Sequence, residues 1–239
     1  MRQGGSNDNF IHKLDTKGDR PAEARFKVHG GLMMREYIEK AMTFAEYEKV
    51  IDGLLAEGKT TGTNQSEAMV NYGKLNRQRM HRLEKTVHLH EEVREAARKV
   101  TRPMIWLIIT EGWCGDAAQN IPVIEKIAAE NDKIRTLYIL RDENLDLMDR
   151  FLTNGARSIP KLIALDADTL DVLGSWGARP AAAQTLFEEM KANGIEKPVI
   201  LEEMQRWYNS DKTRSLQQEF AVLVQNFAGA GRESFAEAA

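Results

Sequence analysis

This chain has very little cysteine and no long hydrophobic run. Cys114 is the only cysteine among 239 residues, which excludes an internal disulfide framework and indicates a reducing compartment. No apolar stretch approaches the roughly 20 residues that cross a bilayer, and the N-terminus lacks the charged-then-apolar order of a signal peptide. We therefore expect a cytoplasmic protein that does not interact with membranes.

An excess of charge of one sign is also missing. The 33 basic and 36 acidic side chains leave a formal net charge of −3 at pH 7. This balance provides no electrostatic attraction to nucleic acid, so we predict no such partner. With 42% hydrophobic residues, the chain can bury one substantial core, or one core with a smaller unit attached. The composition is typical of a globular protein.

The two ends of the chain lack hydrophobic periodicity. Residues 1–34 are rich in Gly, Asp, Lys and Arg, and residues 229–239 are rich in Ala and Gly. Such segments bury too little apolar surface to offset the entropy lost on ordering. We predict a disordered N-terminal extension over 1–34 and a flexible tail over 229–239. Paired methionines at 33 and 34 leave open whether residues 1–32 belong to the native protein.

An N-terminal helical region is predicted over residues 35–99. Thr43 and Glu46 have the spacing of a capping box, and apolar residues follow at helical intervals until Gly58. A second helix follows a polar turn, and a third lies near 91–100. Several basic residues fall mostly off the apolar stripe of the second helix, which is typical of a solvated face. They are Lys74, Arg77, Arg79, Arg82 and Lys85.

A different pattern begins near residue 100. Residues 104–110 and 134–140 are apolar runs of strand length with an amphipathic helix between them, which predicts two parallel strands with a right-handed crossover. An antiparallel hairpin is predicted at 161–176. Helices are predicted at 144–154 and 180–193.

A C-terminal helical extension is predicted over residues 196–228. It contains two helical patterns, 197–208 and 212–227. The sequence Asn-Ser-Asp at 209–211 separates them, because these side chains favour turns and helix caps.

The single cysteine lies where a predicted strand meets a predicted helix, in the segment EGWCGDAAQNIP at 111–122. A helix N-terminus presents unpaired N–H groups and a partial positive charge, and both assist ionisation of a thiol. Gly115 leaves the approach to Cys114 open, and Trp113 provides an apolar wall. The sequence therefore predicts a nucleophilic cysteine; a buried structural cysteine is the alternative.

The motif around this cysteine resembles the thioredoxin family. Its W-C-G-P-C motif appears here as W-C-G-D-A at 113–117, with alanine in place of the second cysteine, and Pro122 matches the kinking proline of the helix. The segment NGARSIPKLIALD resembles the family's cis-proline loop, so Ile159-Pro160 would be the cis bond. WGARP resembles a later turn that would bring Gly177 near the active-site surface. The match covers about residues 100–195.

This resemblance implies an α/β fold: a thioredoxin-like mixed sheet with flanking helices over 100–195, plus the helical extensions on both sides. It implies Cys114 as the catalytic residue. It also implies that the backbone of Ile159 pairs with an extended substrate. The residues expected to bind substrate are Trp113, Gly115, Asp116, Ile159, Pro160 and Gly177.

Two departures from the family pattern limit the mechanism. Ala117 cannot attack a mixed disulfide, and Ile108 stands where many thioredoxins carry a buried acid. Turnover would therefore require an external thiol such as glutathione, or a partner's own cysteine. Asp116 is ambiguous, since it suits the helix dipole but opposes a negative charge on Cys114.

Two functions follow from these observations. The first is monothiol thiol-disulfide exchange with a protein or a low-molecular-weight thiol or disulfide, with no bound cofactor and glutathione as a candidate co-substrate. The second is a non-catalytic module that binds an extended peptide or a partner protein. No metal is expected, because His88 and His90 point apart on a helix. The oligomeric state stays open.

Overall fold

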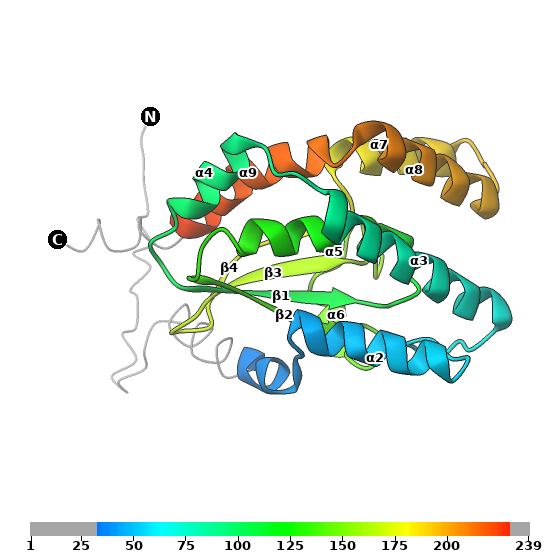
Figure 1. The fold of residues 1–239 in the computed structure, drawn as a ribbon, viewed down its shortest axis with the longest axis horizontal. Helices are drawn as coiled ribbons and strands as arrows, with labels where there is room; N and C mark the ends of the chain where they lie inside the picture. Colours follow the sequence, from blue (N-terminus) through cyan, green and yellow to red (C-terminus); the bar gives the residue numbers. More distant parts are fainter. Residues whose placement is uncertain (1–32, 230–239) are drawn as a thin grey trace, which may run out of the picture.

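A four-stranded mixed sheet forms the centre of the computed structural model, which describes residues 33–229 (Figure 1). The strand order is β2-β1-β3-β4. β1 runs parallel to β2 and antiparallel to β3, and β3 pairs antiparallel with β4. The strands are β1 (Met104–Thr110), β2 (Ile134–Leu140), β3 (Lys161–Asp166) and β4 (Val172–Gly177). The predicted parallel pair and hairpin are both present.

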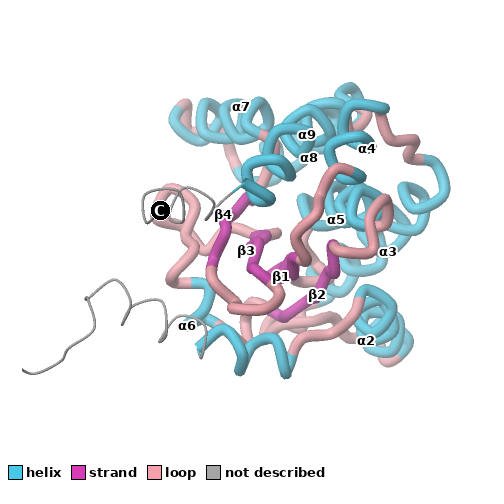
Figure 2. The backbone as a smooth tube through the Cα atoms, turned by 90° about the vertical axis from the view of Figure 1, so that its left-hand side faces the viewer, coloured by secondary structure: helices cyan, strands magenta, loops and turns pink. Residues whose placement is uncertain are grey.

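Helices cover both faces of this sheet. In Figure 2, α2 and α6 lie on one face, and α5 lies on the other with α4 and α9. Residues 33–40 are also helical. The named helices are α2 (Phe44–Ala56), α3 (Glu67–Thr86), α4 (Glu91–Arg98), α5 (Gly115–Ala128), α6 (Leu145–Met148), α7 (Ala181–Ala192), α8 (Lys197–Asp211) and α9 (Arg214–Gly229). Within residues 33–229, none of the helices is long and apolar enough to span a membrane.

The main core lies on both sides of β1, whose seven residues are all buried. On one side, Phe220 of α9 meets Trp106 and Trp176 edge-on, with ring centroids 5.7 and 5.2 Å apart. On the other side, Tyr47 of α2 stacks on Tyr138 of β2 at 5.2 Å. Burial on both faces explains why β1 is a continuous apolar run.

The N-terminal helices are tied directly to the sheet. The predicted capping box forms, with the Thr43 N–H donating to Glu46 Oε2 at 2.8 Å and the Glu46 N–H donating to Thr43 Oγ1 at 3.3 Å. Met42 exchanges two backbone hydrogen bonds with Tyr138 at the edge of β2. Met34, inside the segment predicted to be disordered, is 1% exposed. The rest of that segment, residues 1–32, and residues 230–239 of the predicted tail lie outside the described residues.

Two helix boundaries differ from the predictions. The helix predicted at 144–154 is only the short α6, which ends at Met148, and the predicted range ends in a turn where Asn154 and Gly155 adopt positive φ angles of 49° and 75°. In the C-terminal region, the sequence Asn-Ser-Asp at 209–211 does not end the helix. α8 continues through it, and the reversal falls at Lys212 and Thr213, with φ of 52° and 69°.

Candidate functional site

Cys114 occupies the N-cap of α5, directly after the turn that follows β1. The Ala117 N–H donates to its sulfur at 3.4 Å, and the thiol donates to the Ile159 carbonyl oxygen at 3.2 Å. The predicted cis peptide bond between Ile159 and Pro160 is present. Residues from two distant segments, 45 positions apart, therefore meet at the sulfur as the resemblance implied.

The thiol is less acidic than its position at a helix N-terminus suggests. Burial, and after it the charge of Asp116, raise the pKa of Cys114 from 9.0 to about 12. The Ala117 amide and the Arg179 guanidinium lower this pKa, but burial outweighs them. Cys114 is 7% exposed. The helix N-terminus acts on the sulfur as predicted, yet the resting group is a neutral thiol.

A cavity of about 560 Å³ lies over Cys114. Trp113, Gly115 and Asp116 line it together with Ile159. The walls come from regions outside the sheet: α3 contributes one side and α8 the other. A volume of this size is typical of small-molecule sites.

Gly177 and Pro160, predicted as site residues, do not line this cavity. Gly177 pairs with Lys161 in the hairpin, and a Cβ atom there would lie 2.1 Å from the Pro160 carbonyl oxygen. With φ of 124°, the position also suits only glycine. Both residues therefore shape the proline loop behind Ile159.

Asp116 joins α5 to α8 and to the loop that precedes α7. Its carboxylate accepts a hydrogen bond from the Tyr208 hydroxyl at 2.8 Å and forms an ion pair with Arg179 at 2.7 Å. Asn120 donates to the same hydroxyl at 3.1 Å. Burial raises the pKa of Asp116, while Arg179 and Tyr208 oppose that rise. We call these four residues, Asp116, Asn120, Arg179 and Tyr208, the Asp116 network.

Arg179 and Tyr208 were not predicted from the sequence, although WGARP contains Arg179. Arg179 is nearly buried, with 10% of its side chain exposed, and its guanidinium lies over the Phe187 ring at 3.9 Å. Tyr208 is 92 positions away from Asp116. Nothing in the local pattern of α8 distinguishes Tyr208 from an ordinary core residue of an amphipathic helix.

Two further polar side chains approach the motif from α3. Asn76 is 1% exposed and donates to the Gly112 carbonyl oxygen at 3.3 Å. Arg79 donates to Asn76 Oδ1 at 2.9 Å. A methyl group placed on Gly115 would lie 3.7 Å from Arg79 Nη1, so the guanidinium reaches the residue next to Cys114. Within 33–229, no group of three or more His, Cys, Asp and Glu side chains is arranged to hold a metal ion.

A mixed sheet in which a cysteine caps the helix after β1 and meets a cis-proline loop defines a thioredoxin-like α/β protein. A family model described as thioredoxin matches residues 62–191, more than half of the chain. The chain belongs to the thioredoxin family. The match includes α3, which supplies one wall of the cavity, as well as the sheet.

Two solved structures are similar to this chain. One is a protein of unknown function from Pseudomonas aeruginosa, with 16% identity and a TM-score of 0.48, covering 77% of this chain and 98% of that one. The other is an HIV epitope scaffold, with 19% identity and a TM-score of 0.40, covering 60% and 81%. Neither similarity supports a conclusion about the function of this chain. No curated protein matches the chain.

Proposed function

We propose that this protein is a monothiol thiol-disulfide exchange protein that acts on low-molecular-weight disulfides, with Cys114 as the nucleophile. The Cys114 thiolate attacks one sulfur of a disulfide RSSR, which forms a Cys114–S–S–R bond and releases the other half as RS⁻. The thiolate of an external thiol such as glutathione then attacks the R sulfur of this mixed disulfide, which forms a G–S–S–R disulfide, and Cys114 leaves as thiolate and regains a proton. Ala117 makes the external thiol necessary, because it cannot act as a resolving group.

One observation carries this proposal: the only sulfur nucleophile contacts the proline loop and opens on a cavity large enough for a small disulfide. The α8 wall favours small substrates over an extended protein segment. Residues of α8 line the same cavity as Ile159, where the resemblance implies that a peptide strand pairs, so this helix restricts the room for such a strand. A reducing cytoplasm, which keeps the sole cysteine as a free thiol, is the compartment that suits this chemistry.

The high pKa of Cys114 limits the expected rate. Only a very small fraction of the thiol is ionised at neutral pH, and the thiolate is the attacking form. Exchange is therefore expected to be slow at neutral pH and to accelerate as pH rises. Any substrate that moves α8 outward would relieve burial, which is the largest cause of the raised pKa.

The test is incubation with oxidised glutathione followed by intact-mass measurement. We expect one glutathione adduct on the wild-type chain, its removal by reduced glutathione, and no adduct on Cys114→Ser. Reduction of insulin disulfides is expected to be weak, because the resolving cysteine is absent. A folded wild-type chain that forms no adduct at any pH between 7 and 10 would contradict the proposal.

The second candidate is a non-catalytic binding module. The burial of Cys114 and its neutral resting state favour this function. It predicts a thiol that stays unmodified by oxidised glutathione in the folded chain. The same mass measurement therefore separates the two functions.

A further inference from the structure

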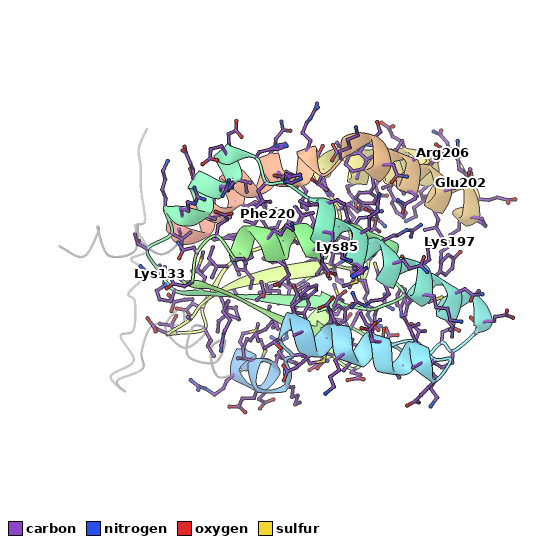
Figure 3. All side chains as sticks on the ribbon, in the orientation of Figure 1. Lys85, Lys133, Lys197, Glu202, Arg206 and Phe220 are labelled. Atoms are coloured by element: carbon purple, nitrogen blue, oxygen red, sulfur yellow. The ribbon has the colours of Figure 1, made fainter. Side chains whose placement is uncertain are left out.

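The cavity over Cys114 carries a charge opposite to that of the whole chain. The chain has a formal net charge of −3, but the cavity is lined by five cationic and only two acidic side chains. The acidic ones are Asp116 and Glu202. The cationic ones are Arg79, Arg141, Arg157, Arg179 and Lys197. Figure 3 shows Lys197 and Glu202 on α8, where they border this site. Cationic side chains concentrated in one cavity favour an anionic ligand.

Three of these arginines already pair with a carboxylate. Arg141 binds Asp142 at 2.7 Å, and Arg157 binds Asp149 at 2.6 Å. Arg179 binds Asp116, but its buried Nε atom has no hydrogen-bond partner among the described residues. Because that Nε atom is buried and the guanidinium is paired with Asp116, Arg179 offers no free charge to a ligand in the cavity.

Arg79 differs from the other three arginines. Within the described chain, the hydrogen bond of its guanidinium goes to the neutral Asn76, and no carboxylate lies within ion-pair distance. Burial, with a smaller effect from Arg82, lowers its pKa. A guanidinium remains charged despite such a shift. Arg79 therefore presents an uncompensated positive charge beside Gly115.

Apolar side chains from two helices also line the cavity. They are Met69 and Tyr72 of α3 and Leu201 and Met204 of α8. A ligand with a short apolar body and an anionic head would place the body between these helices and the head on Arg79. Cys114 lines the same cavity, and the Arg79 guanidinium reaches Gly115, the residue next to it.

We propose that this cavity selects small disulfides and thiols that carry a carboxylate or phosphate, and that Arg79 binds this anionic group. The inference rests on the proposed exchange chemistry at Cys114 and adds the charge class of the substrate. A guanidinium is suited to either oxyanion because it offers paired N–H donors in one plane.

Three disulfides of similar length and different charge test this selection: cystamine, bis(2-hydroxyethyl) disulfide and 3,3′-dithiodipropionate. The rate of adduct formation at Cys114 is measured by mass and divided by the rate for the urea-unfolded chain, which removes intrinsic reactivity. At low ionic strength we expect the dicarboxylate to be favoured over cystamine by about tenfold or more, and salt to reduce the ratio.

Two variants locate the effect. Arg79→Gln should remove most of the preference. Arg82→Gln is the matched control: it lies on the same helix and removes the same charge, but it does not line this cavity. Its preference should remain close to that of the wild type. Equal loss in both variants would mean that diffuse charge, not a site at Arg79, causes the selection.

A non-reactive pair separates this proposal from the exchange chemistry. Suberate and 1,6-diaminohexane replace the disulfides of the two charged probes by carbon, and their binding to Cys114→Ser is followed by calorimetry. Suberate binding that Arg79→Gln abolishes supports anion selection even if Cys114 proves unreactive. Equal normalised rates for all three disulfides, with no suberate binding, would overturn the selection and leave the exchange function intact.

Discussion

The sheet-centred core and the α7–α8 pair are held together in different ways. The core joins α2, α5 and α9 to the sheet and contains side chains that are completely buried, such as Trp106 and Phe220. The α7–α8 pair has a separate cluster of only four buried residues: Ala183, Ile200, Met204 and Tyr208. Figure 1 shows the two helices side by side, apart from the sheet.

A small cluster and a polar network are weaker attachments than a large apolar core. The free energy of local opening follows the amount of buried apolar contact, so α7 and α8 should open at lower cost than the sheet unfolds. Because α8 forms one wall over Cys114, the burial that raises the pKa of this thiol depends on the weaker region. The main core positions the sulfur, and we expect the less stable α7–α8 pair to control access to it.

The largest effect is expected when one substitution in the main core is compared with one in the α7–α8 pair. Phe220→Ala removes a ring that meets two tryptophans and should lower the free energy of global unfolding by about 3–5 kcal/mol. Met204→Ala should instead lower hydrogen-exchange protection in α7 and α8 and leave that of β1 nearly unchanged. Urea denaturation and exchange mass spectrometry measure the two effects. Equal loss of protection in β1 and α8 on Met204→Ala would show that the regions unfold as one.

The next effect concerns the Asp116 network. Tyr208→Phe removes the hydroxyl that donates to Asp116 and accepts from Asn120, which leaves two buried polar groups with a partner fewer. The opening of α8 should become easier by about 1–3 kcal/mol, while global stability changes less. Exchange rates of the α8 amides report this directly. Unchanged α8 protection would mean that apolar packing alone holds the helix.

The pKa of Cys114 provides a third, smaller effect. Asp116→Asn removes the second cause of the raised pKa, and the side-chain amide keeps a carbonyl oxygen for Tyr208. The thiolate becomes more populated at neutral pH, so alkylation by iodoacetamide should be several-fold faster, about tenfold for each pKa unit lost. In the wild type, the rate should still be rising at pH 11. An alkylation rate that levels off near pH 9 would show that Cys114 has the pKa of an ordinary thiol.

The same shift predicts how stability depends on pH. In the unfolded chain Cys114 ionises near its ordinary pKa of 9.0, whereas the folded chain keeps the thiol protonated until about 12. The contribution of the protonated thiol to the free energy of unfolding is therefore fully present below pH 9. It is lost as pH rises from about 9 towards 12. Cys114→Ser should lose less stability than the wild type between pH 9 and 11.

Local patterns predicted the parts of the fold that depend on neighbouring residues. The capping box of Thr43, the continuous apolar run of β1 and the cysteine at the start of α5 each follow from a few adjacent side chains. The helix expected at 144–154 forms only over Leu145–Met148, and the turn at Asn154 and Gly155 was a local signal against extending it that far.

The cavity could not be predicted in the same way, because its walls depend on how helices pack. Arg77 and Arg79 are two residues apart and were both interpreted as part of a solvated face. In the structure, Arg77 binds Asp52 of α2, whereas Arg79 lines the cavity. The rotation of α3 about its axis decides between these roles, and contacts with α2 and α5 set that rotation.

The smallest expected effect tests whether α7 holds Arg179 through an aromatic ring. Phe187→Leu keeps an apolar side chain in the small cluster but removes the ring beneath the guanidinium. Loss of a partly buried cation–π contact should ease the opening of α7 and α8 by about 0.5–1 kcal/mol. If Phe187 acts by positioning Arg179 against Asp116, the effects of Phe187→Leu and Tyr208→Phe on α8 exchange should be non-additive, because both residues then stabilise the same carboxylate. Additive effects would mean that Phe187 contributes only apolar packing, and that Tyr208 maintains the Asp116 network independently of it.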